Sequence, residues 1–193
     1  MDLVERHPEA WREATRHPFL DAVRSGELDP RAFGAWLVQD HHFVRDLLRF
    51  QALLLAEAPR ADQAVLAAGL VALEAELSWF EDHAGRLRLD LQGPRHPTTE
   101  DYAGFLEEVA AGPYAEAIVA LWALERAYLE AWRSAAPGEG RYAEFVEHWT
   151  VPEFAGYVAS LEAAAGRAGG GARAERVFLE VCRLERDFWG IAG

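Results

Sequence analysis

Three acidic residues interrupt runs of large apolar side chains that have helical spacing. Asp40, Glu125 and Glu185 each lie three or four residues from large apolar neighbours on both sides, which is the spacing of a single helix face. Burying an unpaired carboxylate costs several kcal/mol, so each acid needs a hydrogen-bond partner, a proton or a ligand. Because helices normally place their acids toward solvent, three such exceptions favour one shared site.

Carboxylates grouped inside an aromatic pocket suit a flat, basic ligand that forms hydrogen bonds. The aromatic residues expected to line such a pocket are Trp36, Phe43, Tyr102, Tyr128 and Trp149. An aminopyrimidine fits this chemistry, because its ring stacks on aromatic side chains, its amino group donates, and a ring nitrogen can share a proton with a carboxyl group. At least one of the acids should have a raised pKa, since neighbouring carboxylates without a cation cannot all stay charged.

Two alternatives to a shared ligand site remain open from the sequence alone. Each acid could be satisfied separately by an arginine, a tyrosine or a backbone group where helices cross. A metal site is the second alternative, and its candidate ligands are His41, His42, His83, His148 and the pair formed by Glu76 and His83. The Glu-x-x-His signature of di-iron bundles does not occur in the chain, so we expect neither a metal nor another cofactor.

Other familiar site types find no support. The chain has no phosphate-binding loop of the Gly-x-x-x-x-Gly-Lys type. Its single cysteine, Cys182, follows Phe178 and Val181 on an apolar face, where a cysteine more often packs as a small apolar side chain than acts as a nucleophile. One cysteine cannot form an internal disulfide, which fits a reducing cytoplasm.

The composition is that of an acidic chain with enough apolar residues for a full core. It has 193 residues, of which 51% are hydrophobic, and we expect a single domain over residues 1–193. The net charge of −13 repels phosphate backbones, which argues against nucleic-acid binding. No stretch of about 18–20 residues is free of charge and the N-terminus lacks a signal-peptide layout, so we expect no membrane span and a cytoplasmic location.

A series of helices must position the acidic and aromatic residues. Ala, Leu, Glu and Arg dominate, and no run alternates apolar and polar residues, so the sequence predicts an all-α fold in the form of a single-domain helical bundle. Proline and glycine residues mark most of the boundaries. The expected helices cover about 8–16, 18–24, 30–58, 62–89, 100–111, 114–135, 142–149, 152–165 and 174–191. We expect Thr98 or Thr99 to cap the helix at 100–111, and the glycine-rich segment 166–171 to form a mobile loop.

With these elements in order, a set of short motifs over nearly the whole chain resembles the TenA/thiaminase II family. The matching pieces are His17-Pro18-Phe19-Leu20, Gly26-Glu27-Leu28, Phe33, Gln39-Asp40, Pro97-Thr98-Thr99-x-x-Tyr102, Phe105-Leu106 and Phe178-x6-Glu185-x-x-Phe188-Trp189-x-x-Ala192. Each piece is weak alone, but their order and spacing are specific. The resemblance implies the haem-oxygenase-like helical fold and a homo-oligomer, either a dimer or a tetramer.

The resemblance also implies roles for single residues. Asp40 matches an aspartate that contacts the substrate pyrimidine, and Glu185 matches an acid that hydrogen-bonds the pyrimidine ring and donates a proton. Tyr102 and Trp149 match aromatic residues of the family's pocket. Phe43 stands where many members have a tyrosine, which leaves an aromatic wall without its hydroxyl group.

The chain departs from the family pattern at the nucleophile. Members that hydrolyse thiamine use a cysteine in the helix expected at 114–135, followed by a tyrosine, whereas this segment reads Ala123-Leu124-Glu125-Arg126-Ala127-Tyr128. The chain therefore resembles a variant branch in which glutamate replaces the cysteine. Glu125 could act as a general base on water or as a second hydrogen-bonding anchor.

These observations predict a hydrolase of thiamine salvage. Its substrate would be an aminopyrimidine, aminomethyl-pyrimidine or the formylaminomethyl derivative, and carboxylate acid/base chemistry would carry the reaction. One alternative is a non-catalytic pyrimidine-binding or regulatory protein. Another is a metal-dependent oxygenase of the same fold.

Overall fold

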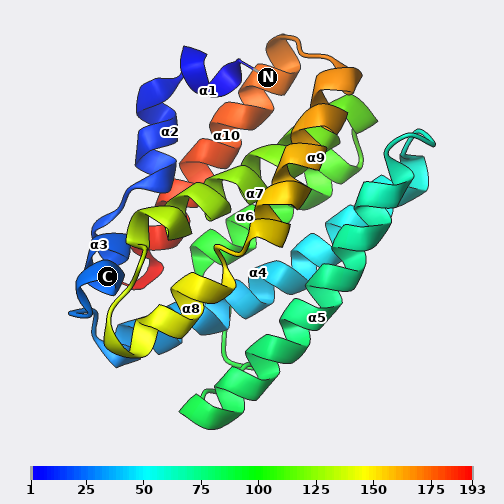
Figure 1. Cartoon of the computed structure of the whole chain (residues 1–193). Helices are drawn as coiled ribbons and strands as arrows, with labels where there is room; N and C mark the ends of the chain where they lie inside the picture. The colour runs from blue at the N-terminus through cyan, green and yellow to red at the C-terminus, as the bar shows by residue number, and fades with distance from the viewer. Residues whose placement is uncertain (1, 193) are drawn as a thin grey trace.

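The computed structural model describes residues 2–192 and folds them almost entirely into helices (Figure 1). Over this range it contains ten α-helices, two short 3-10 helices and no strand, which confirms the predicted all-α fold. The α-helices are α1 (Leu3–Arg6), α2 (Pro8–Thr15), α3 (Pro18–Ser25), α4 (Pro30–Glu57), α5 (Gln63–Leu87), α6 (Pro97–Ala110), α7 (Tyr114–Ala135), α8 (Ala143–His148), α9 (Pro152–Ala168) and α10 (Ala172–Trp189). The 3-10 helices are η1 (Gly140–Tyr142) and η2 (Gly190–Ala192).

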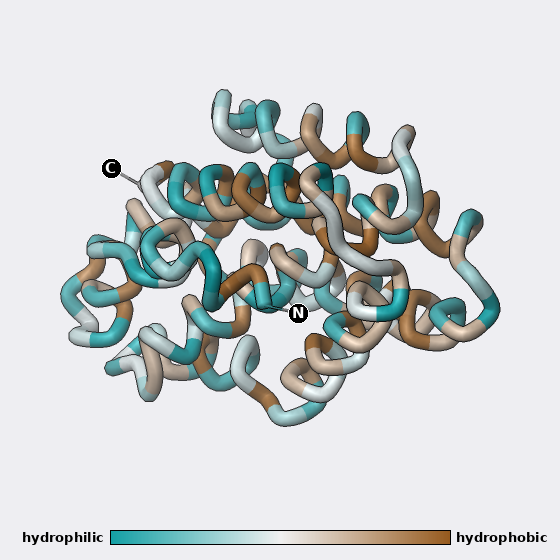
Figure 2. Tube along the Cα trace, turned by 90° about the horizontal axis from the view of Figure 1, so that it is seen from above, coloured by the Kyte–Doolittle hydropathy of each residue, from teal (hydrophilic) through white to brown (hydrophobic). Residues whose placement is uncertain are grey.

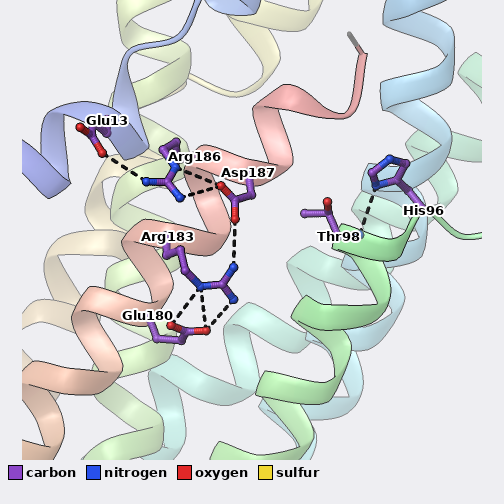
Figure 3. A network of polar contacts seen from close by, with 7 residues as sticks. All are labelled: Glu13, His96, Thr98, Glu180, Arg183, Arg186 and Asp187. Atoms are coloured by element: carbon purple, nitrogen blue, oxygen red, sulfur yellow. Dashed lines mark hydrogen bonds and ion pairs between the residues drawn. The ribbon is translucent and has the colours of Figure 1, made fainter.

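Histidine–proline pairs begin three of these helices, α2, α3 and α6. In α3 and α6 a proline occupies the first turn, and the preceding histidine accepts a hydrogen bond at Nδ1 from the backbone N–H two residues later. For His96 the donor is the N–H of Thr98, at 3.2 Å (Figure 3). The expected cap at Thr98 or Thr99 is therefore wrong, because Pro97 starts α6 earlier and the imidazole of His96 satisfies a free N–H of the first turn.

The glycine-rich segment is shorter than expected. Helix α9 continues through Gly166 and ends at Ala168, so the turn before α10 consists of residues 169–171. The alanines around Gly166 favour helix, and this local preference outweighs the roughly 1 kcal/mol that one glycine costs inside a helix. The expected loop over 166–171 is wrong in its first half.

Helix α7 is the centre of the bundle. Its residues 117–125 are all buried, so the helix is covered on every side, as expected for one that is apolar around its whole circumference. It packs against α2, α3, α9 and α10, while α4 packs against α5 and α6. The buried apolar residues of all these helices form one continuous cluster.

Helix α10 shows how sequence periodicity turns an acid inward. Arg183 and Arg186 lie on its outer face, where they pair with Glu180, Asp187 and, across to α2, Glu13 (Figure 3). The opposite face buries Phe178, Cys182, Glu185 and Trp189. Hydrophilic and hydrophobic residues also alternate along several of the other helices (Figure 2). Glu185 therefore faces the core because of its register on the helix.

Helix α5 lies along the edge of the bundle beside α4 (Figure 1). By length and composition alone it could cross a membrane, and only 22% of its apolar window is buried inside the molecule. Its N-terminus is anchored by the buried Asp62, which pairs with Arg167 of α9 and accepts a hydrogen bond of 2.8 Å from Tyr114 of α7. The inner face of α5 forms one wall of the cavity described next.

Candidate active site

The three predicted acids converge on one cavity. Asp40 comes from α4, Glu125 from α7 and Glu185 from α10, and all three line a cavity of about 290 Å³. The exposed fraction of each residue is small, at 0% for Asp40, 6% for Glu125 and 4% for Glu185. Helices far apart in the sequence thus bring three buried carboxyl groups to one cavity, which is the arrangement expected from their apolar neighbours.

Asp40 has one oxygen bound and one free. Its Oδ2 accepts a hydrogen bond from the hydroxyl of Tyr128 at 2.9 Å, while Oδ1 is buried and has no partner among residues 2–192. Burial raises the pKa of Asp40 well above its usual value, the Tyr128 hydrogen bond opposes that rise, and the charges of Glu76 and Glu185 add to it. A buried, unpaired oxygen beside a cavity is a ready acceptor for a ligand N–H group.

Glu185 is held by a tyrosine behind it. The hydroxyl of Tyr102 donates to Glu185 Oε1 at 2.6 Å, a short distance for such a bond. Burial raises the pKa of Glu185 to about 8, and the Tyr102 hydrogen bond pulls it partly back. A carboxyl group whose pKa lies near neutral pH can both give and take a proton, which suits acid/base chemistry.

Glu125 is the least restrained of the three acids. Among the described residues none forms a hydrogen bond with its carboxyl group, and the neighbouring Leu124 lines the same cavity. Burial raises the pKa of Glu125 to about 8, and the charges of Glu76 and Glu185 contribute further. Its carboxyl oxygens are therefore available to a water molecule or to a ligand.

The aromatic walls match the expectation in part. Phe43, Tyr128 and Trp149 line the cavity. Tyr102 does not, because it lies one layer behind, with its ring centre 4.6 Å from that of Phe43 and its hydroxyl group on Glu185. Tyr102 reaches the site through the carboxyl group that it holds.

Trp36 is the clearest misplacement among the expected wall residues. It is fully buried and is not one of the residues that line the cavity. Its ring packs edge-on against Trp149 at 5.9 Å and stacks on Trp189 at 5.5 Å. Trp36 therefore belongs to the core and supports the cavity wall from behind.

Sequence reasoning named Glu76 only as a possible metal ligand with His83, and it missed two aromatic residues of the cavity. Glu76 of α5, with Phe154 and Tyr157 of α9, also lines it. Glu76 lies three residues after Leu73 and four before Phe80, so the criterion that selected the other acids would have found it. Phe154 and Tyr157 carry no such signal, because aromatic residues on a helix face predict only burial.

The single thiol lies outside the cavity lining. Cys182 is 2% exposed, and burial raises its pKa to about 12. A thiol reacts as its thiolate, so this cysteine is a poor nucleophile at neutral pH. The expectation that Cys182 packs as a small apolar residue agrees with its position in the core.

The histidines considered as metal ligands are spread over the molecule. His42 bonds the carbonyl oxygen of Gly93 at 3.0 Å, and His83 bonds that of Trp79 at 2.9 Å. His148 is the one that lines the cavity. Over residues 2–192, no group of three or more His, Cys, Asp or Glu side chains has an arrangement that could hold a metal ion.

A protein-family model for the TENA/THI-4/PQQC family matches residues 4–192. The chain belongs to this family. A protein of Glycine max described as a probable bifunctional TENA-E protein is 30% identical over 98% of this chain and 90% of its own length. This degree of identity over nearly the full length of both chains agrees with the family match.

Solved TenA structures superpose closely on the chain. A TenA homologue from Pyrococcus furiosus is 33% identical, covers 100% of this chain and 98% of its own, and superposes with a TM-score of 0.94. A putative TenA-like thiaminase from Sulfolobus solfataricus is 18% identical, covers 99% of this chain and 93% of its own, and superposes with a TM-score of 0.89. The second likeness shows the fold alone. The TenA fold is haem-oxygenase-like, and family membership supports a role in thiamine metabolism.

Proposed function

We propose that this TenA-family chain is a hydrolase that acts on an aminopyrimidine of thiamine salvage, either aminomethyl-pyrimidine or its formylaminomethyl derivative. The observation that carries the proposal is the convergence of Asp40, Glu125 and Glu185 on one aromatic-walled cavity. In this cavity Asp40 Oδ1 and the carboxyl group of Glu125 have no hydrogen-bond partner within residues 2–192. Groups left open in this way are suited to a ligand that both donates and accepts hydrogen bonds.

The roles of the three acids follow from their surroundings. Asp40 is fixed on one side by Tyr128, so its free Oδ1 would orient the substrate by accepting a hydrogen bond from the ring amino group. Glu185 is fixed by Tyr102 and would donate a proton to the pyrimidine or to the leaving amine. Glu125 is free of protein hydrogen bonds and would remove a proton from the attacking water.

The proposed reaction balances with water as the only co-substrate. With aminomethyl-pyrimidine, the methylene C–N bond breaks and a C–O bond forms, so hydroxymethyl-pyrimidine and ammonia leave. Where the arm enters as the neutral amine, Glu185 protonates the leaving nitrogen, and the proton that Glu125 takes from water replaces the one that Glu185 gives up. Where the arm enters as the ammonium, ammonia leaves without a further proton, and Glu125 passes the water proton on to solvent. With the formyl derivative, the water oxygen adds to the formyl carbon, the amide C–N bond breaks, the nitrogen takes a proton, and formate and aminomethyl-pyrimidine are released.

Substitution of Glu125 tests the proposal. We expect Glu125→Gln to lower kcat for release of ammonia or formate by at least about 100-fold, because a glutamine cannot accept the water proton, and general-base catalysis typically contributes that much. Glu74→Gln is the matched control, since Glu74 is an exposed residue of α5 that does not line the cavity. Turnover by Glu125→Gln at the rate of the unaltered protein would refute the assignment of the base.

A further inference from the structure

The cavity has an inner end and an outer end. Asp40, Glu125 and Glu185 are buried at the inner end. Glu76 and His148 mark the outer end, where their side chains are 20% and 31% exposed. Glu76 comes from α5, the helix at the edge of the bundle, so this carboxylate lies on a different wall from the acids of α4, α7 and α10. The proposed chemistry at the inner end does not use Glu76.

Two N–H groups hold the carboxylate of Glu76. The indole N–H of Trp149 donates to Oε1 at 2.7 Å, and Nε2 of His148 lies 2.7 Å from Oε2. The imidazole of His148 is itself fixed, because it stacks on Trp79 with ring centres 4.0 Å apart and an angle of 1°. Hydrogen bonds of this kind stabilise the charged form of a carboxylate and fix its orientation. Each oxygen keeps a second lone-pair direction for another donor.

The charge of the cavity wall favours a cation at this point. The acidic residues that line the cavity are Asp40, Glu76, Glu125, Glu153 and Glu185. None of the described lining residues is a lysine or an arginine, so neither of these side chains pairs with the carboxylates from within the cavity wall. The aromatic rings of Tyr128 and Trp149 line the same space, and ring faces also attract cations.

We propose that Glu76 is a specificity residue whose carboxylate binds a positively charged ammonium group on the substrate's side arm, while the inner acids bind the pyrimidine ring. This inference rests on the proposed function and extends it, because it says which form of the substrate the outer end selects. The arm of aminomethyl-pyrimidine is an ammonium at neutral pH, whereas the hydroxymethyl and formylaminomethyl arms are neutral. Glu76 therefore selects the amine.

The test compares charged and neutral ligands in the Glu125→Gln background, so that no substrate is consumed during titration. Calorimetry gives Kd for aminomethyl-pyrimidine and hydroxymethyl-pyrimidine, with and without Glu76→Gln. We expect Glu76→Gln to raise the Kd of aminomethyl-pyrimidine by about tenfold or more, because hydrogen bonds between charged groups are stronger than those between neutral groups. The Kd of hydroxymethyl-pyrimidine should rise by less than about twofold. Glu74→Gln, the same chemical change two residues away on the exposed face of α5, should alter neither affinity.

The neutral ligand also reports on folding, since a variant that binds hydroxymethyl-pyrimidine normally has an intact cavity. If Glu76→Gln raised the Kd of both ligands equally, Glu76 would only support the cavity wall. If it changed neither Kd, Glu76 would play no part in binding. Either result overturns the inference and leaves the proposed function standing. If the protein with unaltered Glu76 binds neither pyrimidine, the proposed function and this inference fall together.

Discussion

Glu125 and Glu185 are two carboxyl groups of the same type that differ in their restraints. Tyr102 donates to Glu185, whereas Glu125 has no hydrogen-bond partner within residues 2–192. Burial raises the pKa of both groups to about 8. Groups that lie this close titrate as a coupled pair, so a pH–rate profile reports the pair rather than either residue alone. The proposed reaction needs one group ionised and the other protonated, which places the maximum rate near pH 8.

Removing the hydroxyl group of Tyr102 should shift this profile in a known direction. Its hydrogen bond lowers the pKa of Glu185, so Tyr102→Phe raises that pKa and moves the basic limb of kcat/KM to higher pH. The rate near neutral pH should fall by about tenfold, because Glu185 is no longer oriented. Tyr142→Phe is the control, since Tyr142 donates to the carbonyl of Leu28 outside the cavity. An unchanged basic limb in Tyr102→Phe would remove Glu185 from the role of acid.

The raised pKa of Glu125 also predicts how stability depends on pH. In the folded state the pKa is about 8, against a usual value of 4.5, so between these values the folded protein holds a proton that the unfolded chain has released. The free energy of unfolding therefore falls as pH rises through this interval. Glu125→Gln has no such proton, so its stability relative to the unaltered protein should grow between pH 5 and pH 9, by on the order of 4 kcal/mol. Urea unfolding of both proteins at pH 5 and pH 9 measures this difference in the free energy of unfolding. The prediction would be contradicted if the free energy of unfolding changed with pH by the same amount in both proteins.

The residues of the site show what the sequence could and could not reveal. Asp40, Glu125 and Glu185 were identifiable because a charged residue inside an apolar stripe conflicts with burial. Trp36 could not be assigned in the same way, since a tryptophan suits a cavity wall and a solid core equally well. Whether an aromatic side chain faces empty space depends on how several helices cross, and helical periodicity carries no such information.

At the scale of the helices, boundaries were predicted best where prolines flank the helix. Helix α7 spans Tyr114–Ala135 as expected, because Pro113 precedes it and Pro137 follows closely. The short α1 was missed, since four residues are too few to show a period. The expected helix at 142–149 is divided between η1 and α8, which is a difference of hydrogen-bond register that residue types do not specify.

Helix α5 depends on a glycine for its contact with α9. A Cβ atom on Gly69 would clash with Gln51 Nε2 and with the hydroxyl oxygen of Tyr157. Those two side chains bond each other at 3.0 Å, and Gln51 also bonds the carbonyl of Leu66 at 2.8 Å. The close approach of three helices at this point therefore requires the absence of a side chain.

Gly69→Ala should accordingly destabilise the protein by about 1–3 kcal/mol, because the added methyl group must displace a buried hydrogen-bonded pair. It should also raise KM, since Tyr157 lines the cavity. Chemical unfolding and steady-state kinetics measure the two effects. Gly85→Ala on the same helix is the control, because no atom lies within 4 Å of its added Cβ, and we expect a gain of about 0.5–1 kcal/mol. Equal free energies of unfolding for the two variants would show that the packing of Gln51 and Tyr157 against Gly69 does not contribute to stability.

At the scale of the whole molecule, charge restricts what can enter the cavity. The net charge of −13 and the acidic lining of the cavity both repel anions. We expect a phosphorylated pyrimidine to bind at least about tenfold more weakly than the unphosphorylated compound, because no lysine or arginine of the described lining can pair with the phosphate. Calorimetry at low and high salt measures the difference, which should narrow as screening increases. Tighter binding of the phosphate ester would contradict the proposed substrate class.

The expected homo-oligomer stays a prediction at this scale. Light scattering would give two or four times the 21.5 kDa of one chain for the expected dimer or tetramer. The all-α fold was predictable from composition and from the proline-initiated helices, and the resemblance to the TenA family implied the haem-oxygenase-like bundle that the TenA structures share. The position of α5 at the edge was not, because its apolar length suggests a core helix.

The indole of Trp149 gives the protein a built-in optical probe. Of the seven tryptophans in the chain, it is the one found among the described lining residues, and its N–H group is bound to Glu76. A ligand that stacks on this ring or draws the carboxylate away changes the surroundings of the fluorophore directly. Occupancy of the cavity can therefore be followed by intrinsic fluorescence without any label.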